Sequence, residues 1–244
     1  MAIARFYHPH PLGVGEVVSL SDNASAHATR ALRLQVGDRI GLFNGDGQDY
    51  QCLLRSISKT ATSVQVESAG LANKESPLHI TLLQGISSGT RMDYTIQKAT
   101  ELGVTCIQPL ATERSVVKLS AERAEKRLAH WQNIVYSACE QCGRASIPSV
   151  LAPLSLSQWL AKHADSHSTQ LLLNPVGATR LADLTAGHGS IALLIGAEGG
   201  LTDAEIRLAS QHGFQSIVLG PRILRTETAA LTAITVMQSL WGDF

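Results

Sequence analysis

The pattern of apolar and polar residues differs between the two parts of the chain. Within residues 1–71, apolar and polar residues follow one another in short β-rich stretches. Strands are predicted at residues 14–20, 38–44, 48–58 and 62–69. The turn Asn44-Gly45-Asp46-Gly47 predicts a hairpin, because Asn-Gly and Asp-Gly pairs tolerate the positive φ of a tight turn. A helical stretch is predicted at residues 21–35. A small all-β unit with one inserted helix is typical of a barrel.

The pattern changes after residues 71–77, a polar segment that ends in proline. The domain boundary is predicted there, with one domain at residues 1–71 and a second at residues 72–244. Apolar strands are predicted at residues 79–85, 104–110, 170–174, 190–196 and 216–220. Helices are predicted at residues 91–102, 122–141, 202–212 and 226–241. Thr202 and Glu205 form a capping box at the start of the third helix, and Gly213 ends it. Alternating strands and helices predict an α/β domain with a mostly parallel sheet.

Composition and charge narrow the functional classes. Of the 244 residues, 44% are apolar and 16% charged, which is the balance of an ordinary globular protein. The formal net charge of zero disfavours a nonspecific nucleic-acid binder and favours a structured target that contains protein. No stretch of about 18 apolar residues and no signal sequence is present, so we expect a cytoplasmic protein without a membrane span.

Cysteines and histidines give no pattern of metal ligands. Cys139 and Cys142 form a C-x-x-C without the second pair that a zinc site needs, so they are interpreted as partly buried thiols at a helix end. The nine histidines form no metal constellation. His8 and His10 flank a proline and are expected at the surface. No metal is predicted.

Three strand ends carry unusual loops, at residues 171–175, 194–202 and 219–229. In an open α/β sheet, ligands bind at the carboxyl ends of the strands. The spacing of Gly196, Gly199 and Gly200 matches neither a dinucleotide motif nor a phosphate-binding loop. Each loop alone could be a tight turn without a ligand. The three together favour a site whose backbone groups hold the edge of an adenine.

The third loop combines apolar side chains with cations. Ile223 and Leu224 lie in a connection where polar residues are expected, and Arg222 and Arg225 flank them. This composition favours an apolar wall for a cofactor and cations directed at a polyanion. Glu227 in the first helical turn could instead complement the helix dipole or pair with Arg225.

Residues 219–229 (LGPRILRTETA) resemble the signature of the SPOUT superfamily's bacterial 16S ribosomal RNA uridine-N3 methyltransferases, the RsmE family. The resemblance extends over nearly the whole chain, through residues 27–33, 36–38, 91–104, 112–115, 140–144 and 195–202. One departure is Ala197, where the family usually has proline. A loop that uses backbone contacts should tolerate this change with some loss of stiffness.

The resemblance implies an N-terminal PUA-like β-barrel for RNA recognition and a C-terminal SPOUT α/β domain with a trefoil knot. General rules alone would have rejected a knot. It also implies a homodimer and a target uridine of 16S ribosomal RNA, methylated at N3 in the small ribosomal subunit. The cofactor would be S-adenosylmethionine. The residues expected to hold it are Leu172, Leu173, Asn174, Ile195, Gly196, Glu198, Gly199, Gly200, Leu219, Gly220, Ile223, Leu224 and Thr226.

Catalytic and RNA-binding roles follow from the cations and from Glu227. Arg225 and Arg222 are expected to stabilise a uridine anion or its adjacent phosphate, and Glu227 to accept the N3 proton or orient an arginine. Arg30 and Arg33 are expected on one face of the first helix, at i, i+3. The RNA-binding residues predicted from these considerations are Arg30, Arg33, Arg114, Lys118 and Arg144.

Three alternatives stay open at this point. A SPOUT enzyme could act on transfer RNA or on large-subunit RNA instead. The chain could also be a noncatalytic RNA-binding module, which would bind no cofactor. A nicotinamide-dependent oxidoreductase is disfavoured by the missing G-x-G-x-x-G motif.

Overall fold

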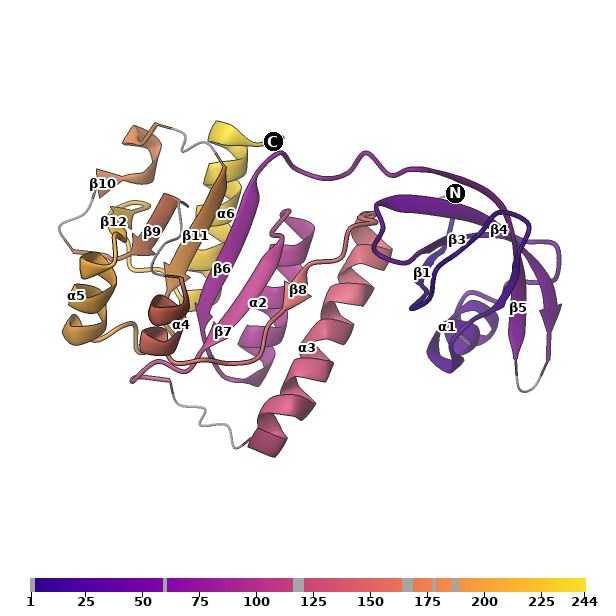
Figure 1. Cartoon of the computed structure of the whole chain (residues 1–244), viewed down its shortest axis with the longest axis horizontal. Coiled ribbons are helices and arrows are strands. Elements are labelled where there is room, and N and C mark those ends of the chain that lie inside the picture. Colours follow the sequence, from indigo (N-terminus) through magenta and orange to yellow (C-terminus); the bar gives the residue numbers. More distant parts are fainter. Residues whose placement is uncertain (1–2, 59–60, 116–120, 164–168, 177–178, 186–188) are drawn as a thin grey trace. The chain divides into compact units, whose positions relative to one another are not determined.

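The structure, a computed structural model, describes residues 3–58, 61–115, 121–163, 169–176, 179–185 and 189–244. The chain forms two compact units (Figure 1). The first comprises Met1–Glu75 together with Tyr136–Ile147, and the second comprises Ser76–Val135 and Pro148–Phe244. The boundary predicted after residue 71 lies near the end of this first segment, but the return of a later segment to the first unit was not predicted.

The first unit contains a five-stranded sheet in the order β1-β3-β4-β5-β2. Its strands are β1 (Arg5–Tyr7), β2 (Val17–Ser19), β3 (Arg39–Phe43), β4 (Gln48–Ile57) and β5 (Thr62–Leu71). Strand β1 pairs with β3 in parallel, and the remaining pairs are antiparallel. Gly45 and Gly47 in the β3–β4 turn have φ values of 100° and 85°, which confirms the predicted hairpin. Strand β1 was not predicted, because three residues are too short for a recognisable alternation.

One side of this sheet packs against the inserted helical segment. The buried residues of this core are Phe6, Leu20, Ala24, Ala28, Ile40, Leu42, Tyr50, Cys52, Leu54, Val64 and Val66. The buried positions of β4 and β5 mostly alternate with exposed ones, as expected of a sheet with one face in water. Helix α1 (Asp22–Ala26) and a π-helical turn, η1 (His27–Ala31), supply Ala24 and Ala28.

The end of this helical segment corrects one prediction. The helix ends at Leu32, and Arg33 takes a left-handed conformation with φ of 56°. Arg33 therefore lies beyond the last helical turn, and the predicted i, i+3 helical face shared with Arg30 is wrong. Both arginines are exposed at the surface of the first unit.

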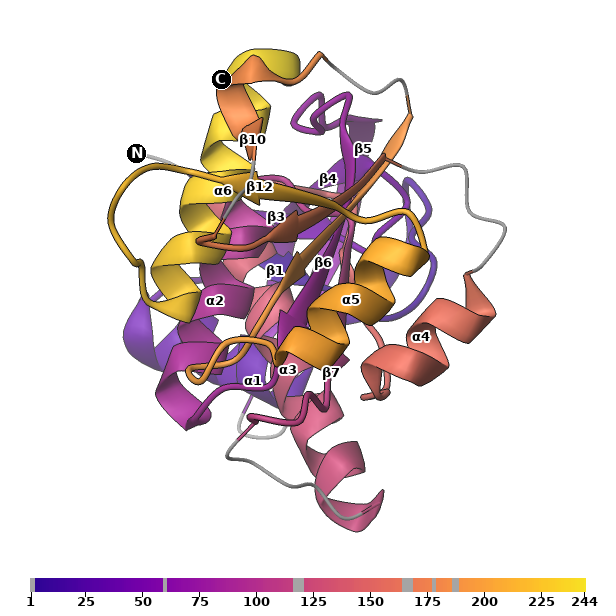
Figure 2. The same cartoon turned by 90° about the vertical axis from the view of Figure 1, so that its left-hand side faces the viewer.

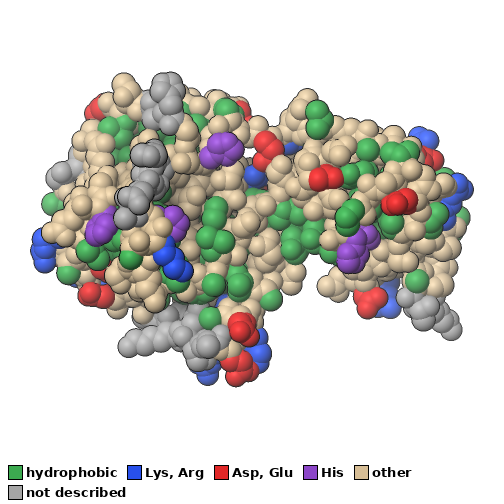
Figure 3. Space-filling model, viewed as in Figure 1, with side chains coloured by type: hydrophobic (Ala, Val, Ile, Leu, Met, Phe, Trp, Pro, Cys, Tyr) green, Lys and Arg blue, Asp and Glu red, His purple; other side chains and the backbone are tan. Residues whose placement is uncertain are grey.

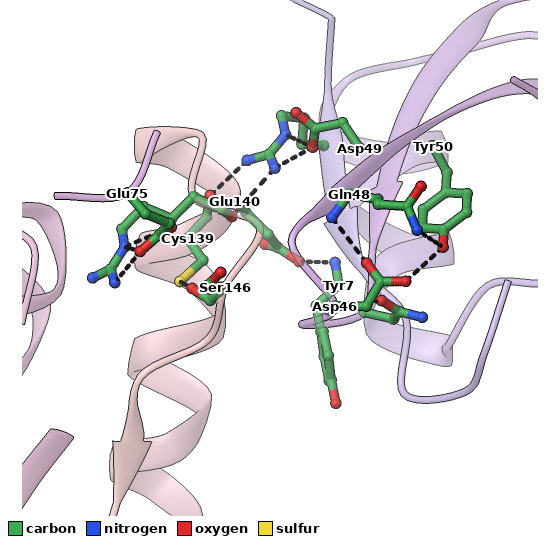
Figure 4. Close-up of polar contacts among 12 residues, drawn as sticks. Tyr7, Asp46, Gln48, Asp49, Tyr50, Glu75, Cys139, Glu140 and Ser146 are labelled. Atoms are coloured by element: carbon green, nitrogen blue, oxygen red, sulfur yellow. Dashed lines mark hydrogen bonds and ion pairs between the residues drawn. The ribbon is translucent and has the colours of Figure 1, made fainter. Parts of the chain in front are cut away.

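Charged side chains fix the end of helix α3 (Ala121–Cys142) within the first unit (Figure 4). Arg5 forms an ion pair with Asp49 and donates to the Cys139 carbonyl at 2.7 Å. Glu140 accepts a hydrogen bond from the backbone N–H of Tyr7 at 3.0 Å, and the Tyr7 ring stacks on that of Tyr136. These contacts explain why residues so late in the chain belong to the N-terminal unit.

The second unit contains a seven-stranded parallel sheet in the order β10-β12-β9-β11-β6-β7-β8. Its strands are β6 (His79–Gly85), β7 (Cys106–Leu110), β8 (Ser149–Val150), β9 (Thr169–Leu173), β10 (Thr179–Arg180), β11 (Ser190–Ile195) and β12 (Gln215–Val218). The central strands β6, β9 and β11 are mostly buried because helices cover both faces of the sheet.

Helices α2 (Gly89–Glu101) and α6 (Thr226–Trp241) lie on one face of this sheet, and α4 (Leu156–Lys162) and α5 (Asp203–Gln211) on the other (Figure 2). A short 3₁₀ turn, η2 (Leu181–Asp183), contacts α6. Thr202 and Glu205 form the predicted capping box of α5. Exposed acidic and basic side chains gather at the N-terminal end of α3, where Lys126 pairs with Glu122 (Figure 3). Within the described residues, no helix is long and apolar enough to cross a membrane.

Candidate active site

A cavity of about 640 Å³ opens at the carboxyl ends of β9, β11 and β12. Residues 173–176, 195–201 and 218–225 form its walls, so the three unusual loops of the sequence meet in one place. Arg91, Arg114, Asp203, Ile206 and the first turn of α6 complete the lining. The volume is in the range of small-molecule sites, roughly 300–1,000 Å³.

The structure brings nearly all of the predicted site residues to this cavity. Arg222, Arg225 and Glu227 line it, as do all but one of the predicted cofactor-binding residues. The exception is Leu172, which is fully buried and packs in the core with Trp159 and Phe214. Side chains alternate between the two sides of a strand, so Leu172 and its neighbour Leu173 cannot both face the cavity.

The second loop, residues 195–201, is folded too tightly for side chains at two glycine positions. Gly200 has φ of 70° and donates to the Ala197 carbonyl at 2.9 Å. A Cβ atom on Gly196 would lie 2.6 Å from the Gly200 carbonyl carbon, and one on Gly85 would lie 2.3 Å from the Ala197 nitrogen. The G-x-x-G-G spacing therefore reflects a compact turn that rests on the end of β6.

Buried hydrogen bonds join this loop to α6. The Thr226 hydroxyl donates to the Gly196 carbonyl at 2.6 Å and accepts from the Gln84 amide at 2.8 Å. Gln84 is fully buried, and Thr226 is 7% exposed. The chain Gln84–Thr226–Gly196 thus connects the end of β6, the second loop and the third loop at its junction with α6. Gln84 was missed, since a polar residue inside an apolar strand shows its partner only in three dimensions.

Arg91 is a second residue that the sequence analysis missed. Its guanidinium donates to Glu198 at 3.0 Å, and its Nε lies 3.9 Å from Glu227. Burial alone would raise the pKa of Glu198, but hydrogen bonds from the Ser88 backbone and from Arg91 hold that pKa below its ordinary value. Arg91 lies in the first turn of the helix that follows β6, at the carboxyl edge of the sheet, and this position is the signal that could have identified it.

Glu227 has a different partner from the one considered in the sequence analysis. Its near cation is Arg91, and the described residues show no ion pair between Glu227 and Arg225. The Glu227 Oε2 atom is buried and has no hydrogen-bond partner among the described residues. A buried polar atom without a partner is costly in a folded protein, so this oxygen is available to accept a hydrogen bond from a ligand.

The third loop presents apolar and cationic side chains together. Ile223 is 88% exposed, and Leu224 is partly buried beside it at the cavity. Arg222 and Arg225 are exposed, and neither forms an ion pair within the part of the chain that the structure describes. Their charges are therefore available to an anionic ligand.

The predicted RNA-binding residues of the second domain separate into three cases. Arg114 donates to the carbonyls of Gly199 and Leu201, at 3.1 and 3.2 Å. Arg144 is 4% exposed and pairs with Glu75 at 2.7 Å, so the predicted direct RNA contact is corrected to a structural ion pair in which the arginine is buried. Lys118 lies outside the described residues.

The structure shows where the cysteines and histidines singled out in the sequence lie. Helix α3 ends at Cys142, as predicted, and burial raises the pKa of the Cys139 thiol to about 12. His8 is buried and not at the surface, because its backbone N–H continues the pairing of β1 with β3 by donating to the Phe43 carbonyl at 2.9 Å. Burial and the neighbouring His10 lower the pKa of His8. The described residues contain no group of three or more potential metal ligands.

Comparisons with known proteins give the context of this cavity. The model of the RNA methyltransferase domain matches residues 74–238, and that of the RNA methyltransferase PUA domain matches residues 20–67. A protein of Buchnera aphidicola named ribosomal RNA small subunit methyltransferase E is 35% identical over 242 residues, which cover 99% of this chain and 95% of that protein.

Two solved structures resemble the whole chain, each covering 100% of both chains. A ribosomal RNA small subunit methyltransferase E from Neisseria gonorrhoeae, bound to S-adenosylmethionine, has a TM-score of 0.93 and 45% identity. A methyltransferase from Legionella pneumophila, in complex with S-adenosylmethionine, has a TM-score of 0.95 and 42% identity. The predicted fold class, a PUA-like barrel followed by a SPOUT domain, is confirmed.

Proposed function

The chain belongs to the family of ribosomal RNA small subunit methyltransferase E, and from this premise we propose that it methylates N3 of one uridine in 16S RNA of the small ribosomal subunit. The predicted enzyme class, an S-adenosylmethionine-dependent ribosomal RNA methyltransferase, is confirmed. The observation that carries the finer proposal is the meeting of Arg222, Arg225 and Glu227 at the cavity of the three loops.

The cavity fits S-adenosylmethionine in shape and chemistry. A Cβ atom on Gly220 would meet nothing within 4 Å, and the backbone of Gly220 does not have a positive φ. The fold itself therefore does not require glycine there, and close approach of a ligand to the backbone explains it. Leu173, Leu224 and Ile223 offer apolar walls to the adenine. When bound, the cofactor supplies the electrophilic methyl group.

Glu227 and the two arginines have complementary roles towards uridine. The N3 proton is weakly acidic, so a base must accept it as the methyl group is transferred. Glu227 accepts that proton through its Oε2 atom, which has no hydrogen-bond partner among the described residues. Arg225 and Arg222 stabilise the negative charge that develops on the uracil ring or the charge of the adjacent phosphate. N3 lies on the pairing face of the base, so the uridine must be exposed or turned out of its stack.

The N-terminal unit supplies further RNA contacts. Arg30 and Arg33 lie on the helical segment and just after it, and neither belongs to an ion pair within the described residues. Both are therefore available to phosphates. An enzyme with this target works in the cytoplasm.

A homodimer is proposed from the surface of α6. The helix contains no charged residue from Thr228 to Trp241, and Leu240 is 45% exposed. Its exposed residues, Thr228, Thr235, Ser239 and Leu240, carry no charge, and a lack of charge is typical of the centre of an interface. Leu240→Arg should convert the dimer to a monomer in analytical ultracentrifugation. Ile3→Arg, at a similarly exposed apolar residue of the first unit, should leave the mass unchanged. A parent chain that sediments as a monomer would refute this part of the proposal.

The reaction is tested with labelled S-adenosylmethionine and small ribosomal subunits that lack the modification. Nucleoside analysis of the 16S RNA should show N3-methyluridine at one site with the parent chain. Arg225→Ala should lower turnover about 100-fold or more while the cofactor still binds, as expected for a lost transition-state contact. Arg207→Ala, at an exposed position of α5, is the matched control. A product on transfer RNA or large-subunit RNA instead would replace the proposed target.

A further inference from the structure

The segment Thr112–Ser115, which follows β7, is held in a fixed conformation against the second loop; we name it the brace segment. The hydroxyls of Thr112 and Ser115 are buried and lie 2.9 Å apart. The Ser115 backbone N–H donates to the Thr112 carbonyl at 3.0 Å. The backbone N–H of Glu113 donates at 3.0 Å to Glu205, which is 7% exposed and caps α5. The brace segment is therefore anchored independently of any ligand.

Arg114 extends from this anchored segment to the cofactor loop. Its Nη1 atom donates to the carbonyls of Gly199 and Leu201, the two residues on either side of Gly200. Gly199 has no room for a side chain, because its Cβ would lie 2.9 Å from the Arg114 Cβ. The guanidinium thus fixes two carbonyls of a turn in the cavity wall whose conformation depends on the positive φ of Gly200.

We propose that Arg114 is a positioning residue for the cofactor, which holds residues 199–201 in the conformation that binds S-adenosylmethionine, and that it is not an RNA contact. The inference rests on the proposed function of the cavity. Both Nη1 hydrogen bonds go to the loop, so Arg114 is already engaged before any RNA arrives. Charge-assisted hydrogen bonds of this kind are stronger than neutral ones, although partial exposure weakens them.

The test compares cofactor binding with RNA binding in the full-length chain. Isothermal titration with S-adenosylmethionine alone should give a Kd about 5- to 10-fold higher for Arg114→Ala than for the parent, consistent with loss of two partly exposed hydrogen bonds. Arg114→Lys can reach one carbonyl, so its Kd should lie between the two. In steady-state assays, the KM for S-adenosylmethionine should rise while the KM for small subunits stays unchanged. Arg207→Ala should change neither constant.

Two results would overturn the inference. One is a cofactor Kd for Arg114→Ala equal to that of the parent. The other is a raised KM for small subunits with an unchanged KM for the cofactor, which would make Arg114 an RNA contact. Failure of the parent chain itself to bind S-adenosylmethionine would instead refute the function proposed for the cavity. Thermal unfolding of each variant verifies that the chain is folded, and Arg114→Lys retains the charge if the alanine variant is unstable.

Discussion

Gly85→Ala tests whether the end of β6 supports the cofactor loop. The added Cβ would lie 2.3 Å from the Ala197 nitrogen and 2.7 Å from the Gly196 carbonyl carbon, both of them backbone atoms. Ordinary contacts begin at 3.4 Å, so the two segments must separate by about 1.1 Å, the difference between 3.4 and 2.3 Å. Neither segment can move freely. Gly85 is paired with Leu110 of β7, and the Gly196 carbonyl is held by Thr226.

Two magnitudes follow from this forced separation. Overpacking at a fixed position costs about 1–3 kcal/mol of unfolding free energy. For a domain of this size, each kcal/mol lowers Tm by roughly 2–4 °C. A displacement of about 1 Å in a loop that positions a reacting group can lower turnover by about 100-fold. We therefore expect a lower Tm together with a large loss of methyl transfer.

The assay combines calorimetry with methyl transfer to small subunits, and Gly89→Ala is the matched control. Gly89 begins α2, four residues later in the same connection, and a Cβ there meets nothing within 4 Å. Its replacement should leave turnover unchanged and raise stability slightly, by about 0.4–1 kcal/mol. If Gly85→Ala had the same Tm and the same turnover as Gly89→Ala, the close contact between β6 and the second loop would be refuted.

Three further substitutions have distinct expected outcomes. Burial raises the pKa of Glu140, although its hydrogen bond from Tyr7 lowers that pKa in part. The folded protein therefore loses stability as the pH rises above 4.5, the ordinary pKa of this carboxyl. In calorimetric scans, Glu140→Gln should unfold at a higher temperature than the parent at pH 7 but not at pH 4. Thr226→Val removes the 2.8 Å acceptor of the Gln84 amide and the 2.6 Å donor to the Gly196 carbonyl, and leaves that amide its longer hydrogen bonds to the Gly85 and Gly196 carbonyls, at 3.1 and 3.5 Å. The substitution should cost about 1–3 kcal/mol in urea unfolding, whereas an unchanged midpoint would show that the two lost bonds are dispensable. Gly220→Val should raise the Kd for S-adenosylmethionine in titrations without lowering Tm, because the added side chain meets only the cavity; a lower Tm with unchanged Kd would contradict this reasoning.

Local signals explain how much of the fold could be predicted. Helix α6 begins and ends at the predicted residues, and β6 does as well, because apolar periodicity and flanking turn residues fix such elements within a short window. Short elements such as β1 and β8 carry too few residues for a pattern. The return of residues 136–147 to the N-terminal unit was also missed, since its contacts join positions more than a hundred residues apart, as in the 134 residues between Arg5 and Cys139.

The loops that form the candidate site could be predicted from the sequence, but the hydrogen-bond and ion-pair partners of its side chains could not. Glycines and unusual strand ends identified the cavity. In a parallel sheet the carboxyl ends of all strands lie at the same edge, so the loops that follow the strands lie at that edge too. Side-chain function depended on neighbours that the sequence does not specify. Arg144 meets Glu75, 69 residues away, and is buried, while Arg91 joins Glu198 and Glu227. An arginine in a motif can thus serve the fold, the cofactor loop or the substrate.

The hydrogen bonds that join Gln84, Thr226 and Gly196 have a consequence for biosynthesis. Gln84 and Thr226 are 142 residues apart, and the third cavity loop precedes only the last helix. A growing polypeptide therefore cannot complete the cavity until Thr226 has left the ribosome. Contacts of such long sequence separation also form slowly during folding. Cofactor occupancy stabilises only the finished molecule. A fragment that stops before Thr226 thus lacks part of the cavity wall and is expected to be inactive.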